Sequence, residues 1–416
     1  MLGAGVGFDC TGLAANASIE ARKRSSKKSQ MRTNIFAGAL VPTDRKLPGI
    51  HGLRAVAALA ILFMHVAAFM FMAAAVPVSR RESVWLDLGG TGVHLFFVLS
   101  GFSLARSWRP VPSALADYAI RRFCRIAPLF YALLVVQQLW RGPHGLVENI
   151  LNASFLFNLT PHFALGIVDG SWTIGAEMLF YAMLPILLVA CRTVAGAAAT
   201  AVAGLMVSWA AHIAASPDPA LNPVALYGYA TFCAATNVGA FSIGLLAFRL
   251  HQTWAGSRLV ARAALALAAA LFAAVVLSPA LYQFYAPGRP AVLVLFAAYG
   301  LLCLSQGIRP SWFTTNAVMQ HVGERSFSVY LMQFPVMTLL MPIYARIEAD
   351  LGGFGASAYL ACAVLTVPIV LVVANLTYHA IELPGMKLGQ WLIARRSSRA
   401  AYQAMPGQAP SSANGS

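Results

Sequence analysis

Apolar runs long enough to cross a lipid bilayer recur along this chain from about residue 50 to residue 381. A transmembrane helix needs about 20 mostly apolar residues, with a range of roughly 17–25. A further run at 150–159 is too short to cross, which indicates a re-entrant or interfacial segment. We therefore predict an all-α, polytopic integral membrane protein with about ten transmembrane helices. The ten runs lie at 50–74, 88–104, 126–140, 172–191, 194–213, 224–250, 259–280, 291–305, 327–344 and 356–381.

The composition excludes a soluble protein. Of the 416 residues, 59% are hydrophobic and only 10% are charged, whereas soluble domains carry about 45–50% apolar and roughly 25% charged residues. So few charges would not cover the surface of a soluble enzyme. A soluble domain with one anchor is excluded as well, because the apolar runs extend through most of the chain.

The basic charge of the chain is explained by membrane orientation. The chain carries 29 Lys and Arg against 14 Asp and Glu, a net charge of +15. Cytoplasmic loops of membrane proteins carry an excess of Lys and Arg. We therefore predict both termini in the cytoplasm, contacts with membrane lipids and no nucleic-acid partner. With that orientation, 24 basic residues lie inside and five outside, namely Arg80, Arg81, Arg141, Arg289 and Arg346.

The two ends of the chain differ in composition from the membrane region. Residues 20–32 are basic and polar with no apolar face, and the last residues are rich in Ser, Gly, Pro and Ala, as in disordered segments. The N-terminus lacks the charged region and apolar core of a signal peptide, and Met31 is an alternative start. We expect a disordered basic cytoplasmic tail at 1–47, a membrane domain at 48–384 and a mostly disordered cytoplasmic tail at 385–416.

Cysteine usage gives no sign of disulfides or of zinc. The six cysteines form no C-x-x-C pair and have no close His partner, and most lie in or beside apolar runs. We expect buried thiols in the protein core and no metal site.

The first apolar run carries two ionisable residues, which are costly inside a membrane. Arg54 and His65 are 11 residues apart, so on a helix they point about 20° apart and lie about 16 Å apart along the axis. They share one face, with Arg54 near the cytoplasmic mouth and His65 near the middle of the hydrocarbon layer. A functional role competes here with interfacial snorkelling of Arg54 and with a helix–helix hydrogen bond from His65.

Polar residues also occur in the second and fourth runs. His94 lies near the outer end of the second run and Ser100 lies further in, where glycine-mediated helix packing is a sufficient explanation. Glu177 lies five residues past Trp172, about 7–8 Å inside the outer boundary of the fourth run. A carboxylate there needs a partner, a proton or access to water, so Glu177 is either a structural ion-pair partner or a functional group.

Three arginines precede the third run. Arg121, Arg122 and Arg125 lie within five residues, and Pro128 follows at the start of the apolar segment. A positive cytoplasmic loop explains part of this cluster. A clamp for phosphate groups explains it equally well, because guanidinium groups bind phosphate bidentately.

Six segments, in order along the chain, resemble the signature segments of the acyltransferase-3 family of integral-membrane acyltransferases. The Arg-x10-His spacing of the family is met by Arg54 and His65, and its Arg-x-x-Arg segment by Arg122 and Arg125. Together the six segments extend over nearly the whole membrane region. They are PGIHGLRAVAALAILFMH (48–65), GVHLFFVLSGF (92–102), RRFCRIAPLF (121–130), SWTIGAEMLFYAMLP (171–185), RSFSVYLMQFP (325–335) and HAIELP (379–384).

The chain departs from the family pattern at four positions. His51 replaces the usual Asp before Gly-Leu-Arg, His94 stands where an Asp is common, Thr173 replaces the Ser after Trp, and Gln333 falls where His is frequent. The difference at His94 matters most, because it replaces a carboxylate by a titratable imidazole. We expect the short form of the family, with no hydrolase-like domain after the last span.

The resemblance implies transfer of an acyl group, usually acetyl, from cytoplasmic acyl-CoA to a hydroxyl group. Typical acceptors are sugars of lipopolysaccharide, exopolysaccharide or peptidoglycan, and sometimes antibiotics. The resemblance also implies that Arg54 and His65 are the essential pair of the first helix and that Arg122 and Arg125 are the basic pair for CoA. We expect acyl-CoA as a co-substrate, no permanently bound cofactor, and a multi-pass location in the inner (cytoplasmic) membrane.

The expected depths of these residues in the membrane suggest a separate role for each of them. Arg122 and Arg125, with Arg54 at the same mouth, would hold the phosphate groups of CoA. His65 would act as general base or as a transient acyl acceptor, because a sugar hydroxyl needs activation and an imidazole with an ordinary pKa of about 6.5 is available in its neutral form. Glu177 would orient the base or bind the acceptor.

Residues of the second and fourth runs are candidates for contact with the acceptor. They are His94, Trp172 and Ser100, beside Glu177. Their expected position favours an acceptor that arrives from the outer side.

Two other classes of function compete with acyl transfer. A transporter or flippase for a lipid-linked sugar would also use about ten helices, but it predicts a two-fold hydropathy symmetry. Residues 50–213 and 224–381 show no convincing repeat of this kind. A purely structural scaffold would give no compensation for the free-energy cost of placing these charged groups inside the membrane.

Overall fold

The computed structural model describes residues 47–74, 86, 88–108, 114–214, 231–277 and 291–403. These residues form helices and connecting loops and contain no β-strand, which confirms the predicted all-α fold. The long helices are α2 (Pro48–Ala74), α4 (Gly92–Ser107), α5 (Ala114–Arg141), α7 (Trp172–Ala190), α8 (Val194–Ala214), α10 (Ala234–Thr253), α11 (Arg258–Leu277), α12 (Ala291–Ile308), α15 (Ser326–Asp350), α16 (Ala356–Thr377) and α17 (Leu383–Gln403). The short elements are α6 (Leu146–Ala153), η1 (Phe157–Leu159), α13 (Trp312–Thr315), α14 (Ala317–Glu324) and the π-helical segment η2 (Tyr378–Glu382).

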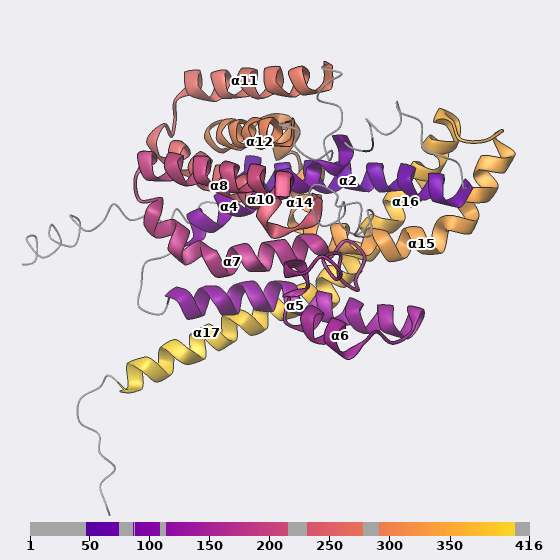
Figure 1. Cartoon of the computed structure of the whole chain (residues 1–416), viewed down its shortest axis with the longest axis horizontal. Helices are drawn as coiled ribbons and strands as arrows, with labels where there is room; N and C mark the ends of the chain where they lie inside the picture. The colour runs from indigo at the N-terminus through magenta and orange to yellow at the C-terminus, as the bar shows by residue number, and fades with distance from the viewer. Residues whose placement is uncertain are drawn as a thin grey trace, which may run out of the picture.

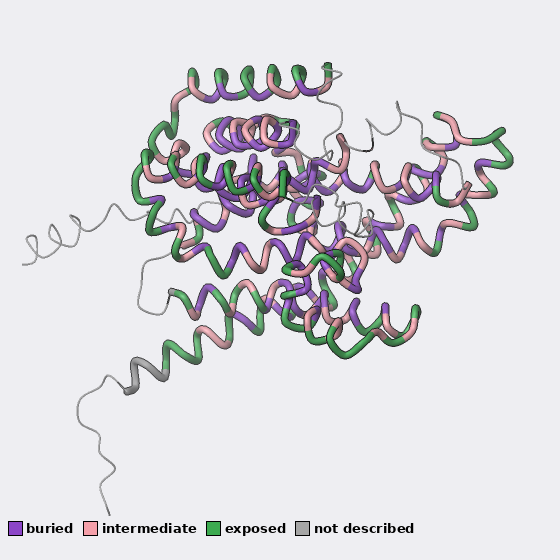
Figure 2. The backbone as a smooth tube through the Cα atoms, viewed as in Figure 1, coloured by how far each residue is buried: buried purple, intermediate pink, exposed green. Residues whose placement is uncertain are grey.

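The long helices pack side by side, and most of them run in the same direction across Figure 1. The middle of the bundle is formed by α2, α4, α10 and α12, in which α4 and α12 contact each other and both contact α2 and α10. Helix α4 is almost entirely buried, whereas few residues of α8 and α11 on the outside are buried (Figure 2). Since outer helices with apolar exposed faces suit a lipid environment, the arrangement agrees with a membrane-embedded bundle.

Two glycines allow the central helices α4 and α10 to meet closely. Gly101 of α4 faces the Phe241 carbonyl of α10, and Gly244 of α10 faces the Val98 carbonyl of α4. A methyl group at either glycine would overlap that carbonyl oxygen. The close approach of these helices brings the preceding residue, Ser100, into the middle of the bundle.

Eight helices within the described residues are long and apolar enough to cross a membrane. Each of them coincides with one of the ten predicted runs. The other two runs coincide with α5 and α10, which carry charged and polar side chains along with their apolar ones. The protein is therefore a polytopic helical membrane protein, and the count of ten spans and the cytoplasmic position of both termini stay predictions.

The run at 150–159 does not form a membrane span. It lies across the end of α6 and the short helix η1, with Ile150 exposed and Phe157 fully buried. Both ends of this segment are exposed, because Leu159 is exposed like Ile150, and only residues between them are buried in the bundle.

The C-terminal prediction was wrong for most of its length. Residues 385–403 are helical, because α17 continues α16 through η2. Gly385 and Gly389 are one turn apart and pack against Cys124 of α5, and the absence of side chains lets the two helices approach. The polar composition of the tail conceals this contact, since two small residues suffice to make it. Of the tail predicted at 1–47, only Leu47 lies among the described residues.

The cysteines within the described residues agree with their prediction. Cys124, Cys191, Cys233, Cys303 and Cys362 are all buried and free. They fill positions in the core as small apolar side chains do.

Candidate active site

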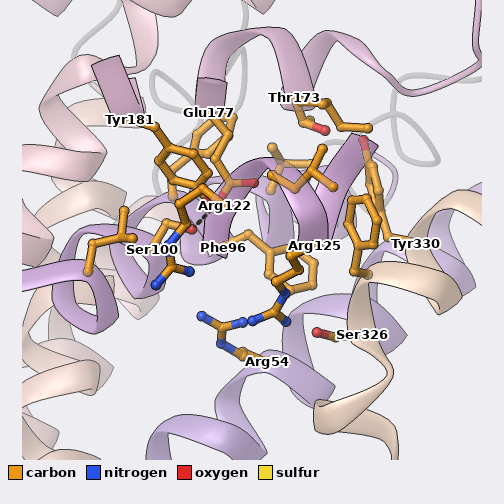
Figure 3. Close-up of a pocket in the computed structure, with 16 residues that line it drawn as sticks. Arg54, Phe96, Ser100, Arg122, Arg125, Thr173, Glu177, Tyr181, Ser326 and Tyr330 are labelled. Atoms are coloured by element: carbon orange, nitrogen blue, oxygen red, sulfur yellow. Dashed lines mark hydrogen bonds between the residues drawn. The ribbon is translucent and has the colours of Figure 1, made fainter. Parts of the chain in front are cut away.

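The arginines predicted to bind phosphate line one pocket together with Glu177 (Figure 3). The walls of this pocket, called the arginine pocket below, come from α2, α4, α5, α7 and α15. Phe96, Phe97 and Phe327 supply part of the apolar wall. The polar residues that line it are Arg54, Ser100, Arg122, Arg125, Thr173, Glu177, Tyr181, Ser326 and Tyr330.

Three guanidinium groups converge in the arginine pocket. Arg122 and Arg125 are three residues apart and so lie on one face of α5, while Arg54 approaches from α2. Figure 3 shows the three groups pointing toward one another, and all three side chains are partly buried. Among the described residues, the one carboxylate within ion-pair distance of any of them is Glu382, which lies 3.9 Å from Nε of Arg125. A cluster with this excess of positive charge suits a polyanionic ligand.

Aromatic rings and a hydroxyl group hold Arg122. Its guanidinium lies 5.8 Å from the ring centres of both Tyr118 and Tyr181, at a distance where cation–π attraction operates. Its Nη2 donates a hydrogen bond to Oγ of Ser107, 3.2 Å away. Helices α4, α5 and α7 thus share in orienting this arginine.

Glu177 is held by two hydroxyl groups. Oγ of Ser100 and the phenol of Tyr181 both donate hydrogen bonds to Oε1 of Glu177. Tyr181 lies four residues after Glu177 and therefore on the same face of α7. The other oxygen, Oε2, accepts no hydrogen bond within the described part of the chain, and Figure 3 shows a Glu177 oxygen directed into the pocket.

The position of Glu177 corrects one expectation. Its predicted place near an outer, acceptor-binding end separated it from the arginines, whereas the structure puts all of them in one pocket. The reason is the segment before α7, which folds into the bundle: Ile167 and Val168 are buried, and Nδ2 of Asn158 donates to the carbonyl of Trp172 at 3.3 Å. Helix α7 therefore begins inside the protein.

His65 lies beside the arginine pocket rather than in it. The residues that line the pocket do not include His65, whose ring centre lies 4.7 Å from that of Phe334. Gln333 adjoins the imidazole. Tyr330, which does line the pocket, contacts Phe334 one turn along α15. Arg54 and His65 therefore both face α15, as their shared helix face predicts, and two aromatic rings connect their surroundings.

The predicted acceptor-side residues are not brought together. Ser100 lines the arginine pocket, but His94 and Trp172 do not. His94 is buried, with its ring 5.1 Å from that of Phe296, and Trp172 packs on Phe97 and Phe232. Contact of this set with an acceptor stays a prediction.

The sequence-based search missed two residues of the site. Tyr181 carries a usable signal, because it lies one helical turn from Glu177. Glu382 lies within HAIELP, a segment that supports the family resemblance, but its place at the end of an apolar run conceals that it is fully buried.

The arginine pocket lies within the part of the chain that matches a known family. The sequence profile of the acyltransferase-3 family, described as an acyltransferase domain, matches residues 47–375. The chain belongs to this family. The resemblance drawn from the six segments is thereby confirmed, and the protein is a membrane acyltransferase.

Known relatives are similar over most of the chain. The acyltransferase MdmB of Streptomyces mycarofaciens is 28% identical over 379 residues, which cover 83% of this chain and 93% of that protein. Peptidoglycan O-acetyltransferase OatA of Listeria monocytogenes is 24% identical over 381 residues, 82% of this chain and 56% of that protein. Putative peptidoglycan O-acetyltransferase YrhL of Bacillus subtilis is 24% identical over 383 residues, 82% of this chain and 55% of that protein. The chain thus spans little more than half the length of the last two relatives, and no solved structure matches it.

Proposed function

We propose that this acyltransferase moves an acyl group, with acetyl as the expected group, from acyl-CoA to a hydroxyl of a cell-surface or lipid-linked glycan. The observation that carries the proposal is the convergence of Arg54, Arg122 and Arg125 in one pocket. CoA is a polyanion, and arginine forks bind phosphate groups bidentately while keeping their charge when partly desolvated. The pocket would hold the phosphate groups of CoA, which acts as a co-substrate.

The acyl group would then lie along α2 toward His65. Because His65 lies about 16 Å from Arg54 along the helix, one extended donor would reach both residues. Nδ1 of His65 is buried and accepts no hydrogen bond from the described residues, and a buried polar atom of this kind calls for a partner. The acceptor hydroxyl would supply that partner.

In the chemical step, the acyl group moves from the sulfur of CoA to the oxygen of the acceptor. The acceptor oxygen bonds to the carbonyl carbon of the thioester, the carbon–sulfur bond breaks, and CoA leaves as a thiolate. His65 takes the proton of the hydroxyl as the new bond forms and returns it to the departing sulfur. No other reactant is needed for the atoms and charges to balance.

Glu177 would serve substrate binding within the arginine pocket. Its Oε1 is occupied by Ser100 and Tyr181, so Oε2 is left to accept a hydrogen bond from a substrate N–H or O–H group. A charged acceptor strengthens such a bond. The carboxylate would also reduce repulsion among the three arginines.

The names of two relatives support the proposed class of acceptor. Both are called peptidoglycan O-acetyltransferases, one of them putatively, which favours a glycan hydroxyl as the acceptor here. We also propose a location in the inner membrane, and the distribution of basic residues supports the placement of both termini in the cytoplasm. That orientation gives the basic face access to cytoplasmic acyl-CoA.

The experiment compares acyl transfer by the wild type, His65→Ala and His144→Ala. The control residue His144 pairs with Glu148 at 2.9 Å between α5 and α6, away from the pocket. Ester-linked acyl groups on surface glycans are measured in cells that carry each variant or none, and membrane insertion is checked by immunoblotting. We expect acylation with the wild type and His144→Ala, and none with His65→Ala. Equal acylation in all strains, including the deletion, would refute the proposed function, and full activity of His65→Ala would refute its catalytic role.

A further inference from the structure

A second carboxylate lies just behind the arginine pocket. Glu382 is completely buried and does not line the pocket, so it is not placed to touch a ligand there. An ionised carboxylate in such a position costs several kcal/mol unless partners offset the loss of water. Its partners therefore indicate what the residue does.

Glu382 reaches its position through an irregular turn of helix. It is the last residue of η2, the π-helical segment between α16 and α17. A π-helical turn contains one extra residue, which rotates the side chains on its two sides by about 100° relative to a regular helix. Such segments often occur at functional sites. Here the irregular turn ends on a buried acid directed at α5.

Residues at the start of α15 hold this turn in place. Nε of Arg325 donates to Oδ1 of Asn375 at 2.8 Å, and its guanidinium lies 4.8 Å from the ring centre of Tyr378. Three residues later, Oγ of Ser328 donates to Oε2 of Glu382 at 2.8 Å. Since residues three apart share a helix face, one face of α15 fixes η2 at both of its ends.

The remaining oxygen of Glu382 faces Arg125. Oε1 accepts no hydrogen bond from the described residues and lies 3.9 Å from Nε of Arg125. Because the carboxylate lies on the Nε side of the guanidinium, the two terminal nitrogens of Arg125 are left for the pocket, which this side chain lines. With its two terminal nitrogens facing the pocket, a guanidinium can bind a phosphate end-on through two parallel hydrogen bonds.

We infer that Glu382 is a positioning residue that orients Arg125 toward the acyl donor. The inference rests on the proposed function of the arginine pocket. The buried carboxylate balances part of the charge of the cluster and keeps Arg125 from turning away from Arg54 and Arg122. Loss of its charge should weaken donor binding and leave the chemical step at His65 nearly unchanged.

The test uses purified full-length protein with CoA as the binding probe and acetyl-CoA as the donor. Glu382→Gln keeps the shape and removes the charge, and Glu382→Asp keeps the charge but draws it back by one methylene. We expect Glu382→Gln to raise the KM for acetyl-CoA about tenfold with kcat within about twofold, as for loss of one charge-assisted interaction. Glu382→Asp should give an intermediate KM. The matched control is Glu348→Gln, because Glu348 is another buried glutamate of the bundle. This variant should have the KM and kcat of the wild type.

A double-variant cycle shows whether Glu382 acts through Arg125. The dissociation constant for CoA is measured for Arg125→Gln with and without Glu382→Gln. In the Arg125→Gln background, we expect Glu382→Gln to change the dissociation constant for CoA by less than about twofold. The reason is that the free-energy effects of substitutions at interacting residues are not additive. Equal effects in both backgrounds, or a normal KM in both Glu382 variants, would overturn the role of Glu382 alone. A wild type that neither binds CoA nor transfers acetyl groups would overturn the proposed function as well.

Discussion

Helices α15 and α16 bury one glutamate near each end of the pair, and the two glutamates have different surroundings. At the end next to the arginine pocket, Glu382 follows α16, accepts a hydrogen bond from Ser328 and lies 3.9 Å from Arg125. At the far end, about 30 Å from Ser328 along α15, Glu348 is only 3% exposed. Neither of its oxygens accepts a hydrogen bond from the described residues.

The difference teaches that burial alone does not identify a functional acid. Glu348 has no ion-pair partner among the described residues, and one turn before it Tyr344 forms a hydrogen bond of 2.5 Å with Thr366 rather than with the acid. Glu382, by contrast, has the charged Arg125 beside it, and this arginine lines the arginine pocket. Each end of the helix pair has a pocket nearby within the described residues, but of these two only the arginine pocket, at the Glu382 end, is lined by charged side chains; the pocket at the other end, lined in part by Phe354 and Tyr359, has none. A charged partner rather than burial therefore distinguishes the two acids.

The largest effect is expected when one arginine is removed near each end of the α15–α16 pair. Arg54→Ala should lower kcat/KM for acetyl-CoA by about 100-fold or more, since two charge-assisted hydrogen bonds to phosphate are worth about 1.5–3 kcal/mol each. Arg346→Ala, at an exposed position near the far end, should have no effect. Steady-state kinetics of the two purified variants provide the measurement. Equal losses in both variants would show that the effect is general rather than local to the pocket.

The next largest effect is expected at Glu177. Glu177→Gln should lower kcat/KM by about 30-fold, because the amide replaces a charged acceptor that Ser100 and Tyr181 hold in place. Tyr181→Phe removes one of the two donors and should cost about fivefold. The measurement is acetyl transfer at varied acetyl-CoA and acceptor concentrations. A Tyr181→Phe loss larger than that of Glu177→Gln would contradict the view that the tyrosine acts through the carboxylate.

A smaller effect is expected from the hydroxyl that supports Glu382. Ser328→Ala removes its hydrogen bond and should raise the KM for acetyl-CoA about threefold, since the neutral donor is worth about 0.5–1.5 kcal/mol. The matched variant at the far end is Tyr344→Phe, which removes the bond to Thr366 and should lower thermal stability without changing KM. A KM change in Tyr344→Phe as large as that in Ser328→Ala would remove the distinction between the two ends.

The smallest effect on transfer is expected at Glu348. Replacement of this acid by Met, which has a similar volume, should leave kcat and KM unchanged. It should raise the free energy of unfolding by about 1–2 kcal/mol, because a buried group without partners is removed. Thermal unfolding in detergent, followed by circular dichroism, is the check. Lower stability or lower activity would indicate a partner for Glu348 and would weaken the contrast with Glu382.

Much of the helical layout could be predicted from local features of the sequence. All ten predicted runs correspond to helices, because an apolar segment of sufficient length has few other stable conformations in a membrane. The helix of residues 385–403 was missed for the opposite reason. Its contact with α5 depends on Gly385 and Gly389, and nothing in the local composition shows that Cys124 faces them.

The candidate site was predictable only in part. Arg54, Arg122 and Arg125 were expected together, because all three lie at the predicted cytoplasmic ends of their apolar runs, and one pocket holds them. Glu177 was expected elsewhere, since counting from the start of its apolar run assumes that the helix begins at the membrane surface. The buried segment before α7, with Ile167 and Val168 in the core, invalidates that assumption.

The sequence by itself determined that this chain forms membrane helices and that Arg54 and His65 share one helix face, because run length and helical period are local properties. Only the tertiary structure decided which charges meet. Arg54, Arg125, Glu177 and Glu382 come from different helices, far apart along the chain. Their distances are set by close packing at glycines such as Gly101 and Gly385 and by the irregular turn of η2. Helix packing, which involves residues from the whole chain, therefore assembles the pocket from side chains that the sequence presents separately.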